Sequence, residues 1–162
     1  MKNDLITTRL RMTPASAADA YDLWVLWIDP DVRRYLWDDR ILPLEEAEQV
    51  VARFENELGL WVIRPHDYGH TIGFAGLRKA DWCDEVEPLI GFYPFYWGEG
   101  YGEESLRALM DYAVRTLKQT TLVAGVDALN QASRTLVERV GFVQTAEFPG
   151  DTASVLRYRW QG

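Results

Sequence analysis

Trp97-Gly98-Glu99-Gly100-Tyr101-Gly102 is the stretch of this sequence that most constrains the fold. An apolar segment predicted as a strand, residues 86–93, precedes it, and apolar residues at helical spacing follow it over residues 105–117. A strand that runs through a glycine-rich turn into a helix leaves backbone N–H groups unpaired at the helix N-terminus, where the helix dipole favours an anion. Alternating glycines let the backbone approach a ligand and adopt positive φ. The stretch therefore predicts a phosphate-binding turn.

Two other phosphate-binding folds use glycine-rich turns, and the surroundings of this turn argue against both. The dinucleotide-binding fold places its turn after the first strand of a βαβ unit, with an acidic residue about 20 positions later. Here the turn follows a predicted antiparallel meander over residues 60–93. A Walker loop requires Gly-Lys-Ser/Thr, whereas this chain has Gly102-Glu103-Glu104. A nucleotide-binding oxidoreductase is therefore the least favoured interpretation.

The composition is that of a globular protein. The chain has 162 residues, of which 48% are hydrophobic and 26% charged, as expected for one domain, residues 1–162, with a sizeable core. Its formal net charge of −8 argues against a nucleic-acid partner, because binding to a phosphate backbone needs clustered Lys and Arg. The charge is compatible with a cationic amine substrate, but an acidic surface that keeps the protein soluble is the favoured interpretation.

The sequence also indicates a compartment. The single cysteine, Cys83, cannot form an internal disulfide, and residues 1–10 lack the apolar segment and cleavage site of a secretory signal. No apolar stretch approaches the roughly 20 residues needed to span a bilayer. We therefore expect a cytoplasmic protein with no membrane partner. No metal site is expected, because His66 and His70 lie in a predicted turn rather than on one helix face.

The remaining sequence predicts an α+β domain. Alternating polar and apolar residues indicate seven strands, over residues 9–13, 60–64, 71–77, 86–93, 121–126, 142 onward and 153–160. Apolar residues at helical spacing indicate helices over residues 16–27, 43–58, 105–117 and 133–140, with a short one over residues 31–37.

The glycine turn and three further segments resemble one known family. Residues 97–104, with the helix that follows, resemble the acyl-CoA-binding motif of GNAT-superfamily N-acetyltransferases, in particular the RimJ/RimL-like branch that acetylates ribosomal-protein N-termini. The other segments resemble this branch's opening strand, its helix break and its last helix: Thr7-Thr8-Arg9-Leu10-Arg11-Met12, Asp29-Pro30-Asp31-Val32, and Asn130-Gln131-Ala132-Ser133 with Val140-Gly141-Phe142. The resemblance spans nearly the whole chain. Trp97, Gly102 and Glu103 depart from the family's commoner residues, but none of them removes a backbone donor.

The resemblance implies a GNAT fold and a donor substrate. The fold is a central mixed, mostly antiparallel seven-stranded sheet, splayed between the fourth and fifth strands and flanked by about four helices. The donor is acetyl-CoA, whose arm lies in the splay and pairs with the backbone of Ile90, Gly91 and Phe92. The turn would hold the pyrophosphate through Trp97, Gly98, Glu99, Gly100, Tyr101, Gly102 and Glu103. Asn130 and Ser133 would face the thioester end of the cleft.

Direct transfer to an amine needs a proton acceptor and a donor for the departing thiolate. Glu87 is the candidate base, because it lies on the fourth strand where many relatives carry a carboxylate; the alternative is a solvated strand-edge residue. Its neighbour Pro88 indicates a bulge or an edge. Ser133 is the candidate donor to the coenzyme sulfur; its alternative is helix capping, for which Asn130 is equally suited.

Aromatic residues around the expected cleft have two interpretations. Three tyrosines near the turn are possible acids, although aromatic residues beside a glycine turn usually pack: Tyr93, Tyr96 and Tyr101. Three tryptophans fall where this family builds one wall of the acceptor cleft, and core packing is expected for most of them: Trp24, Trp27 and Trp37.

The sequence thus favours an N-acetyltransferase that moves an acetyl group from acetyl-CoA directly to a primary amine in a ternary complex. The amine belongs to a protein N-terminus or to a small molecule. The alternative is a domain of the same fold that binds acyl-CoA without turnover. Edge strands and exposed aromatic residues are compatible with a homodimer. The acceptor is not specified, because the segments that would shape its pocket, residues 14–45, 65–70 and 149–153, carry no recognisable motif.

Overall fold

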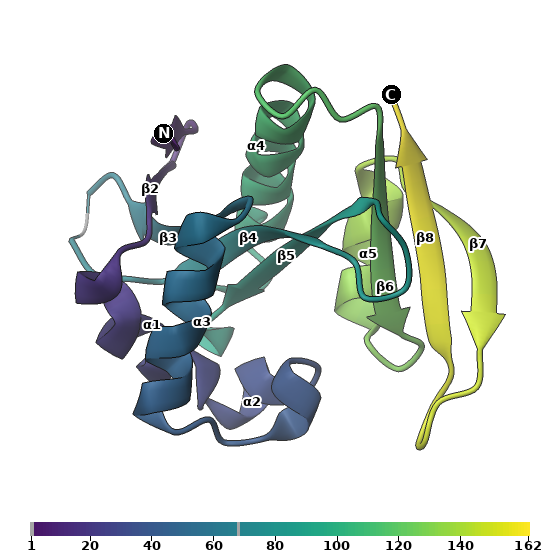
Figure 1. Ribbon diagram of the computed structural model, residues 1–162, viewed down its shortest axis with the longest axis horizontal. Coiled ribbons are helices and arrows are strands. Elements are labelled where there is room, and N and C mark those ends of the chain that lie inside the picture. Colours follow the sequence, from purple (N-terminus) through teal and green to yellow (C-terminus); the bar gives the residue numbers. More distant parts are fainter. Residues whose placement is uncertain (1, 68) are drawn as a thin grey trace.

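The computed structural model describes residues 2–67 and 69–162, which form one eight-stranded sheet with helices on both faces (Figure 1). The strand order is β1-β2-β3-β4-β5-β6-β8-β7. The strands are β1 (Leu5–Ile6), β2 (Leu10–Pro14), β3 (Gly59–Pro65), β4 (Gly73–Lys79), β5 (Val86–Phe92), β6 (Thr121–Asp127), β7 (Val143–Phe148) and β8 (Val155–Gln161). The prediction of seven strands omitted β1, whose two residues are too few to show alternation.

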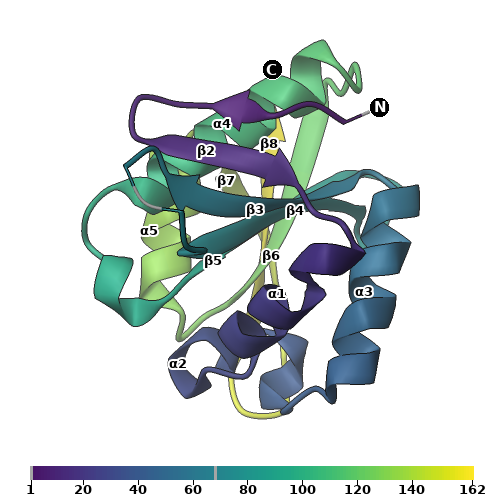
Figure 2. The ribbon, with the colours of Figure 1, turned by 90° about the vertical axis from the view of Figure 1, so that its left-hand side faces the viewer.

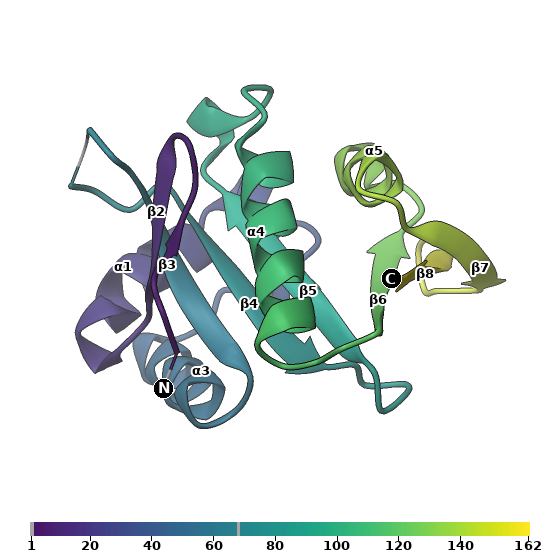
Figure 3. The same cartoon turned by 90° about the horizontal axis from the view of Figure 1, so that it is seen from above.

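The sheet is splayed where the family resemblance implied. All neighbouring strands are antiparallel except β5 and β6, which are parallel and joined by a single bridging pair, Val86 and Leu122. Beyond that pair the two strands diverge, as the view from above shows (Figure 3). The β5 strand is the fourth of the predicted strands and β6 the fifth. The divergence leaves polar backbone edges that are open to a ligand.

Helices cover the two faces of the sheet in two layers (Figure 2). Helices α1 (Ala20–Trp27), α2 (Pro30–Arg33) and α3 (Leu44–Asn56) lie on one face, and α4 (Tyr101–Arg115) and α5 (Gln131–Arg139) on the other. Each layer encloses its own cluster of buried apolar residues, one centred on Trp27 and Phe74 and the other on Leu109 and Tyr158. Burial of these two clusters is the main stabilisation of the sheet–helix packing. No helix in the described residues has the length and apolarity that crossing a membrane requires.

The helix after the glycine turn begins earlier than predicted. Its first residue is Tyr101 rather than Ser105, because Gly100 is the N-cap and the chain enters the helix directly from a left-handed residue. The buried stripe Leu106, Leu109, Met110 and Ala113 is as predicted, whereas Val114 lies on the exposed side. Gly102 and Glu103 therefore belong to the first helical turn and place their N–H groups at the positive end of the helix dipole.

The short helix expected over residues 31–37 ends at Arg33. Trp37, Asp38 and Asp39 that follow have φ values of 56°, 55° and 58°, a left-handed run that no helix can continue. The Arg33 guanidinium holds this turn by donating to the Asp39 carbonyl at 2.9 Å and to its carboxylate at 2.6 Å. The prediction missed the turn because helical spacing of apolar residues does not report φ.

Candidate active site

The glycine turn has the conformation of an anion cradle. Gly98 and Gly100 have φ values of 78° and 82°, in the left-handed region. A Cβ at Gly98 would meet no atom within 4 Å, so its conformation, not crowding, favours glycine. The first i→i−4 bond of α4 runs from Glu104 N to Gly100 O, which leaves the N–H groups of the three preceding residues for a ligand. These residues fit a pyrophosphate.

Every second residue of β5 directs its backbone N–H and C=O groups towards the opening between β5 and β6. Tyr93 N donates to Ile72 O, at 3.1 Å, so residues of the same parity direct their backbone groups towards β4. Ile90 and Phe92 have the opposite parity and face the opening, although the Phe92 carbonyl is taken by the Trp97 Nε1 donor at 2.9 Å. Ile90 therefore presents the free donor and acceptor for a pantetheine amide.

Gly91 plays a different part from the predicted one. Its backbone faces β4, so it cannot pair with a ligand between β5 and β6. A Cβ at Gly91 would lie 2.6 Å from Phe74 Cε1, and the glycine instead lets Phe74 pack closely against β5. Pro88 sits in an unshifted register opposite Leu77, so it marks no bulge, and β5 is not an edge strand of the sheet, although its side towards β6 is open at this residue. Its missing N–H faces the splay and leaves nothing to pair with β6.

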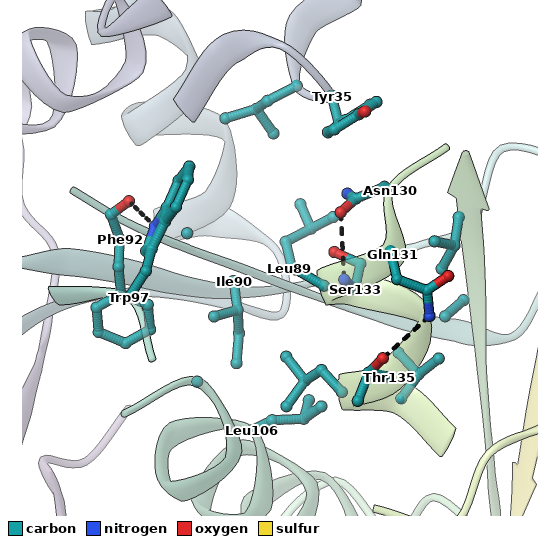
Figure 4. Close-up of a pocket in the computed structure, with 18 of the residues that line it drawn as sticks. Tyr35, Leu89, Ile90, Phe92, Trp97, Leu106, Asn130, Gln131, Ser133 and Thr135 are labelled. Carbon is teal, nitrogen blue, oxygen red and sulfur yellow. Dashed lines mark hydrogen bonds between the residues drawn. The ribbon is translucent and has the colours of Figure 1, made fainter. Parts of the chain in front are cut away.

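One cleft connects the turn to the catalytic candidates. It has a volume of about 660 Å³ and continues from the glycine turn past Ile90 to Glu87 and Ser133, then opens beside the segment after α2. Figure 4 shows Leu89 and Ile90 across from Ser133, with Tyr35 above Asn130 at the mouth. All the predicted coenzyme-binding residues except Glu99 line this cleft. Glu99 does not line the cleft, and its backbone carbonyl accepts a hydrogen bond from Arg9 Nη1.

Glu87 is buried, with 3% of its surface exposed, so its interpretation as a solvated strand-edge residue is wrong. Arg78 Nε and Nη2 donate to Glu87 Oε1, at 3.0 and 2.7 Å. Gly125 N donates to Oε2 at 2.8 Å. A carboxylate oxygen accepts about two hydrogen bonds, so Oε2 has one acceptor position left for a proton-bearing group in the cleft.

The same carboxylate bridges three strands at the vertex of the splay. Arg78 is on β4, Glu87 on β5 and Gly125 on β6, so a side-chain oxygen occupies the place where a strand carbonyl would otherwise receive the Gly125 N–H. A Cβ at Gly125 would lie 3.0 Å from the Trp82 ring, which covers this point. This bridge lies at the point along the two strands where the pairing of β5 with β6 ends.

The sequence left open whether Ser133 or Asn130 caps helix α5, and the structure separates the two residues. Asn130 Oδ1 accepts from Ser133 N at 3.2 Å, which makes Asn130 the N-cap of α5 (Figure 4). Ser133 Oγ has no hydrogen bond within the described residues and faces the cleft. The hydroxyl is therefore available to a group in the cleft.

The sequence and fold of this chain match known proteins throughout. Residues 9–143 match the model of the acetyltransferase (GNAT) domain. The chain belongs to the GNAT acetyltransferase family. The L-amino acid N-acyltransferase MnaT of Escherichia coli is 30% identical over 143 residues, which cover 83% of this chain and 77% of MnaT.

Solved structures agree with this GNAT fold. The structure of yncA from Salmonella typhimurium with its cofactor acetyl-CoA has a TM-score of 0.80 at 22% identity, covering 94% of this chain and 93% of that one. RimL, a ribosomal L7/L12 alpha-N-protein acetyltransferase in complex with coenzyme A, has a TM-score of 0.80 at 17% identity and covers 98% of both chains. Membership makes this protein an acyltransferase, and acetyl-CoA-dependent N-acetylation is the activity of its family.

Glu103 and Glu104, in the first turn of α4, are each paired with an arginine from another part of the chain, and Glu103 also with an arginine of its own helix. Glu103 contacts Arg107 at 2.9 Å and Arg139 at 3.6 Å. Glu104 accepts from Thr7 Oγ1 at 2.7 Å and from Arg9 Nε at 3.0 Å. Burial alone would raise the pKa of Glu104, but the hydrogen bonds from Thr7 and Arg9, with the charge of Arg9, outweigh it and lower the pKa.

This lowered pKa predicts a pH-dependent contribution to folding. A depressed carboxyl pKa stabilises the fold above its ordinary value of 4.5, and that contribution is lost as the pH falls through the lowered value. Glu104→Gln should therefore lower the free energy of unfolding at about pH 7 by at most about 1 kcal/mol, as for a partly exposed pair. Thermal melts of both proteins should show a smaller difference at about pH 3. A Tm difference that persists unchanged at low pH contradicts this.

The tyrosines near the GNAT turn are engaged in packing or hydrogen bonds. Burial raises the pKa of the Tyr93 hydroxyl, and the nearby carboxylates Asp29 and Asp22 add to the effect, so this residue is protonated at neutral pH. Tyr96 O–H lies 2.7 Å from His70 Nε2. The Arg9 guanidinium lies over the Tyr101 ring, and its Cζ is 4.3 Å from the ring centroid. Their role as acids remains an interpretation, and packing accounts for Tyr101.

The tryptophans of the N-terminal region are core residues. Trp27 is fully buried and packs edge-on against Trp37 and Phe74, at centroid distances of 5.5 and 5.6 Å. Trp24 Nε1 donates to Leu42 O at 2.8 Å. None of these tryptophans is among the described residues that line the cleft. The end of the cleft remote from the glycine turn is lined instead by Asp31, Arg34 and neighbouring residues, of which the sequence had not picked out Arg34 individually.

No group of three or more His, Cys, Asp or Glu side chains arranged for a metal ion occurs in the part of the chain that the structure describes. His66 Nε2 lies 2.8 Å from Thr7 O, and His70 contacts Tyr96. The two histidines thus have separate partners. The expectation that this GNAT enzyme uses no metal remains a prediction.

Proposed function

We propose that this protein transfers the acetyl group of acetyl-CoA directly to the primary amine of a small molecule in a ternary complex. The observation that carries the proposal is the single cleft that joins an anion cradle, a free strand backbone, a buried carboxylate and a free hydroxyl. Donor and acceptor would enter from opposite ends, which is the arrangement that direct transfer requires.

Each residue has a defined part in this mechanism. The turn Gly98–Gly102 and the first turn of α4 would bind the pyrophosphate, and the Ile90 N–H would face the carbonyl oxygen or the arm of the donor. Glu87 Oε2 would accept the proton of the attacking amine, directly or through one water. Ser133 Oγ would donate a hydrogen bond to the departing thiolate.

The acceptor is the finer part of the proposal. The relative at 30% identity is named for L-amino acids, which favours a small amine over a ribosomal protein. RimL shares the fold at 17% identity and adds no argument about the substrate. Arg34 supports an acceptor with a carboxylate, because this exposed cation lines the acceptor end and has no acid within ion-pair distance in the described residues.

A panel of amines tests this function. The purified protein is incubated with acetyl-CoA and, in turn, amino acids, amino-acid amides, polyamines and peptides, and free thiol and acetylated product are measured. We expect thiol release above hydrolysis, fastest with amino acids, and intersecting initial-velocity lines. Tight CoA binding without thiol release on any acceptor would instead support the alternative, a domain that binds acyl-CoA without turnover.

Replacing Ser133 with Ala is expected to lower kcat about ten- to a hundredfold, because the thiolate loses its donor, with little change in the KM for acetyl-CoA. Tm should be nearly unchanged, since Asn130 caps the helix. Asn130→Ala is the matched variant and should lower stability by about 1 kcal/mol. Steady-state kinetics and thermal melts separate the two effects. A large Tm loss in Ser133→Ala would assign the hydroxyl to the fold.

A further inference from the structure

Arg9 lies in the bend between β1 and β2, 90 residues before Glu99, and its side chain contacts the glycine turn. Its Nη1 donates to the Glu99 carbonyl at 2.8 Å and its Nε to Glu104 Oε1 at 3.0 Å. The guanidinium lies 4.3 Å from the centroid of the Tyr101 ring. A Cβ at Gly100 would come within 3.3 Å of Arg9 Nη2. The Arg9 side chain therefore lies against the turn on both sides of its left-handed N-cap, Gly100, as well as at Gly100 itself.

These contacts orient a donor of the cradle. In a trans peptide the carbonyl and the N–H point in opposite directions. Because Arg9 draws the Glu99 carbonyl towards β2, the N–H of Gly100 in the same peptide plane points the other way, and Gly100 lines the cleft. Gly100 is left-handed and has no side chain to hold it, so its orientation depends on partners such as this one.

The same guanidinium changes the electrostatics of the turn. Glu104 lies in the first turn of α4, where its charge opposes a bound phosphate. Arg9 neutralises it through a pair with side-chain exposures of 41% and 20%. Thr7 Oγ1 and the backbone N–H of Arg9 donate hydrogen bonds to the second carboxylate oxygen, Glu104 Oε2, at 2.7 and 3.2 Å. The carboxylate is thereby bound on the side of β2.

We propose that Arg9 is a positioning residue for the pyrophosphate of acyl-CoA: it sets the Glu99–Gly100 peptide and retains Glu104 so that the turn presents its N–H groups to the donor. The inference rests on the proposed use of acetyl-CoA in this cleft. The structure gives Arg9 no contact with the cleft itself, so it acts through the turn.

The test compares two donors in Arg9→Met. Acetyl-CoA carries the pyrophosphate, whereas S-acetylpantetheine lacks it and reaches only the strand and catalytic groups. Loss of charge-assisted hydrogen bonds should raise the KM for acetyl-CoA about tenfold to a hundredfold, with kcat within about threefold. The kcat/KM for S-acetylpantetheine should be unchanged, which a general loss of structure would not give.

Three further variants sharpen the test. Arg11→Met removes the next cation along the chain, which lies on β2 and pairs with Asp4, and should leave the kinetics with both donors unaffected. Arg9→Lys keeps the charge without the planar fork and should restore part of the affinity for acetyl-CoA. Glu104→Gln keeps Arg9 but weakens the ion pair that fixes its guanidinium. If Arg9 acts by positioning the turn, this variant should have a several-fold higher KM for acetyl-CoA. If Arg9 acts only by attracting the phosphates through its charge, the KM should be lower, because a negative charge has been removed.

The outcomes separate this inference from the proposed function. If the wild-type protein transfers acetyl from neither donor, the proposed function fails, whether or not the protein binds CoA. If the wild type prefers acetyl-CoA and Arg9→Met leaves that preference unchanged, the inference about Arg9 is overturned. A KM increase for acetyl-CoA alone, partly restored in Arg9→Lys and repeated in Glu104→Gln, supports it.

Discussion

Replacing Glu87 with Gln is expected to lower kcat about 100- to 10,000-fold, which is the range for loss of a positioned proton acceptor. Gln has nearly the same shape, and its amide oxygen can still accept from Gly125 N, but it cannot take a proton from the attacking amine. The KM for acetyl-CoA should change little, because the turn that binds the pyrophosphate is separate from this carboxylate. Steady-state kinetics with a saturating amine measure both quantities.

The control separates proton transfer from the bridge at the vertex of the splay. Arg78→Lys weakens the contact with Glu87 but retains the charge and the carboxylate, so kcat should fall less than about tenfold. Thermal melts of both variants report any opening of the vertex. Equal losses of kcat in Glu87→Gln and Arg78→Lys, with equal losses of Tm, would show that Glu87 serves the fold and that another group takes the proton.

Replacing Trp27 with Ala is expected to reduce the free energy of unfolding by about 3–5 kcal/mol, because it empties the fully buried centre of the layer that carries the acceptor wall. Trp27→Phe should cost much less. Trp27 Nε1 is buried and has no hydrogen-bond partner in the described residues, so its removal offsets part of the lost packing. Chemical denaturation with urea measures both values.

Trp61→Phe is the matched variant for this prediction. Trp61 is also fully buried, but its Nε1 donates to Asn3 O at 2.9 Å. The substitution loses that bond and leaves a carbonyl without its donor, so it should cost more than Trp27→Phe. Equal costs, or a larger cost for Trp27→Phe, would contradict the view that the indole N–H of Trp27 weakens the core.

The sequence predicted those features of the site that local chemistry determines. Alternating glycines between a strand and a helix favour positive φ, and Gly98 and Gly100 do adopt it, whereas their binding of a phosphate stays a prediction. The position of the splay, between β5 and β6, was implied by the resemblance to the GNAT family and not by the strand pattern itself. The sequence left the cap of α5 open between Ser133 and Asn130, because both side chains suit that position, and the structure assigns it to Asn130.

Features that depend on distant contacts were not predictable in the same way. Arg9 and Glu99 are 90 residues apart, and no periodicity links them. Arg78 could have been found, since it faces Glu87 across the predicted β4–β5 pair, but only with the register known. The backbone parity that separates Ile90 from Gly91 likewise follows from which partner each strand has, which single-strand alternation does not reveal.

The acceptor end shows the same limit. The α2 segment lines the cleft because Pro30 starts a helix that ends at Arg33, and a left-handed turn then brings the chain back towards α3. Neither the end of the helix nor the turn has a strong sequence signal. Arg34 therefore became a candidate for substrate binding only once the cleft was known.

A crystal structure of the protein with CoA tests the central claim most directly. We predict the pyrophosphate on the N–H groups from Gly98 to Glu103, the pantetheine paired with the Ile90 backbone, and the thiol between Glu87 and Ser133 Oγ. CoA bound outside the splay, or with its thiol remote from Glu87 and Ser133, would contradict the account.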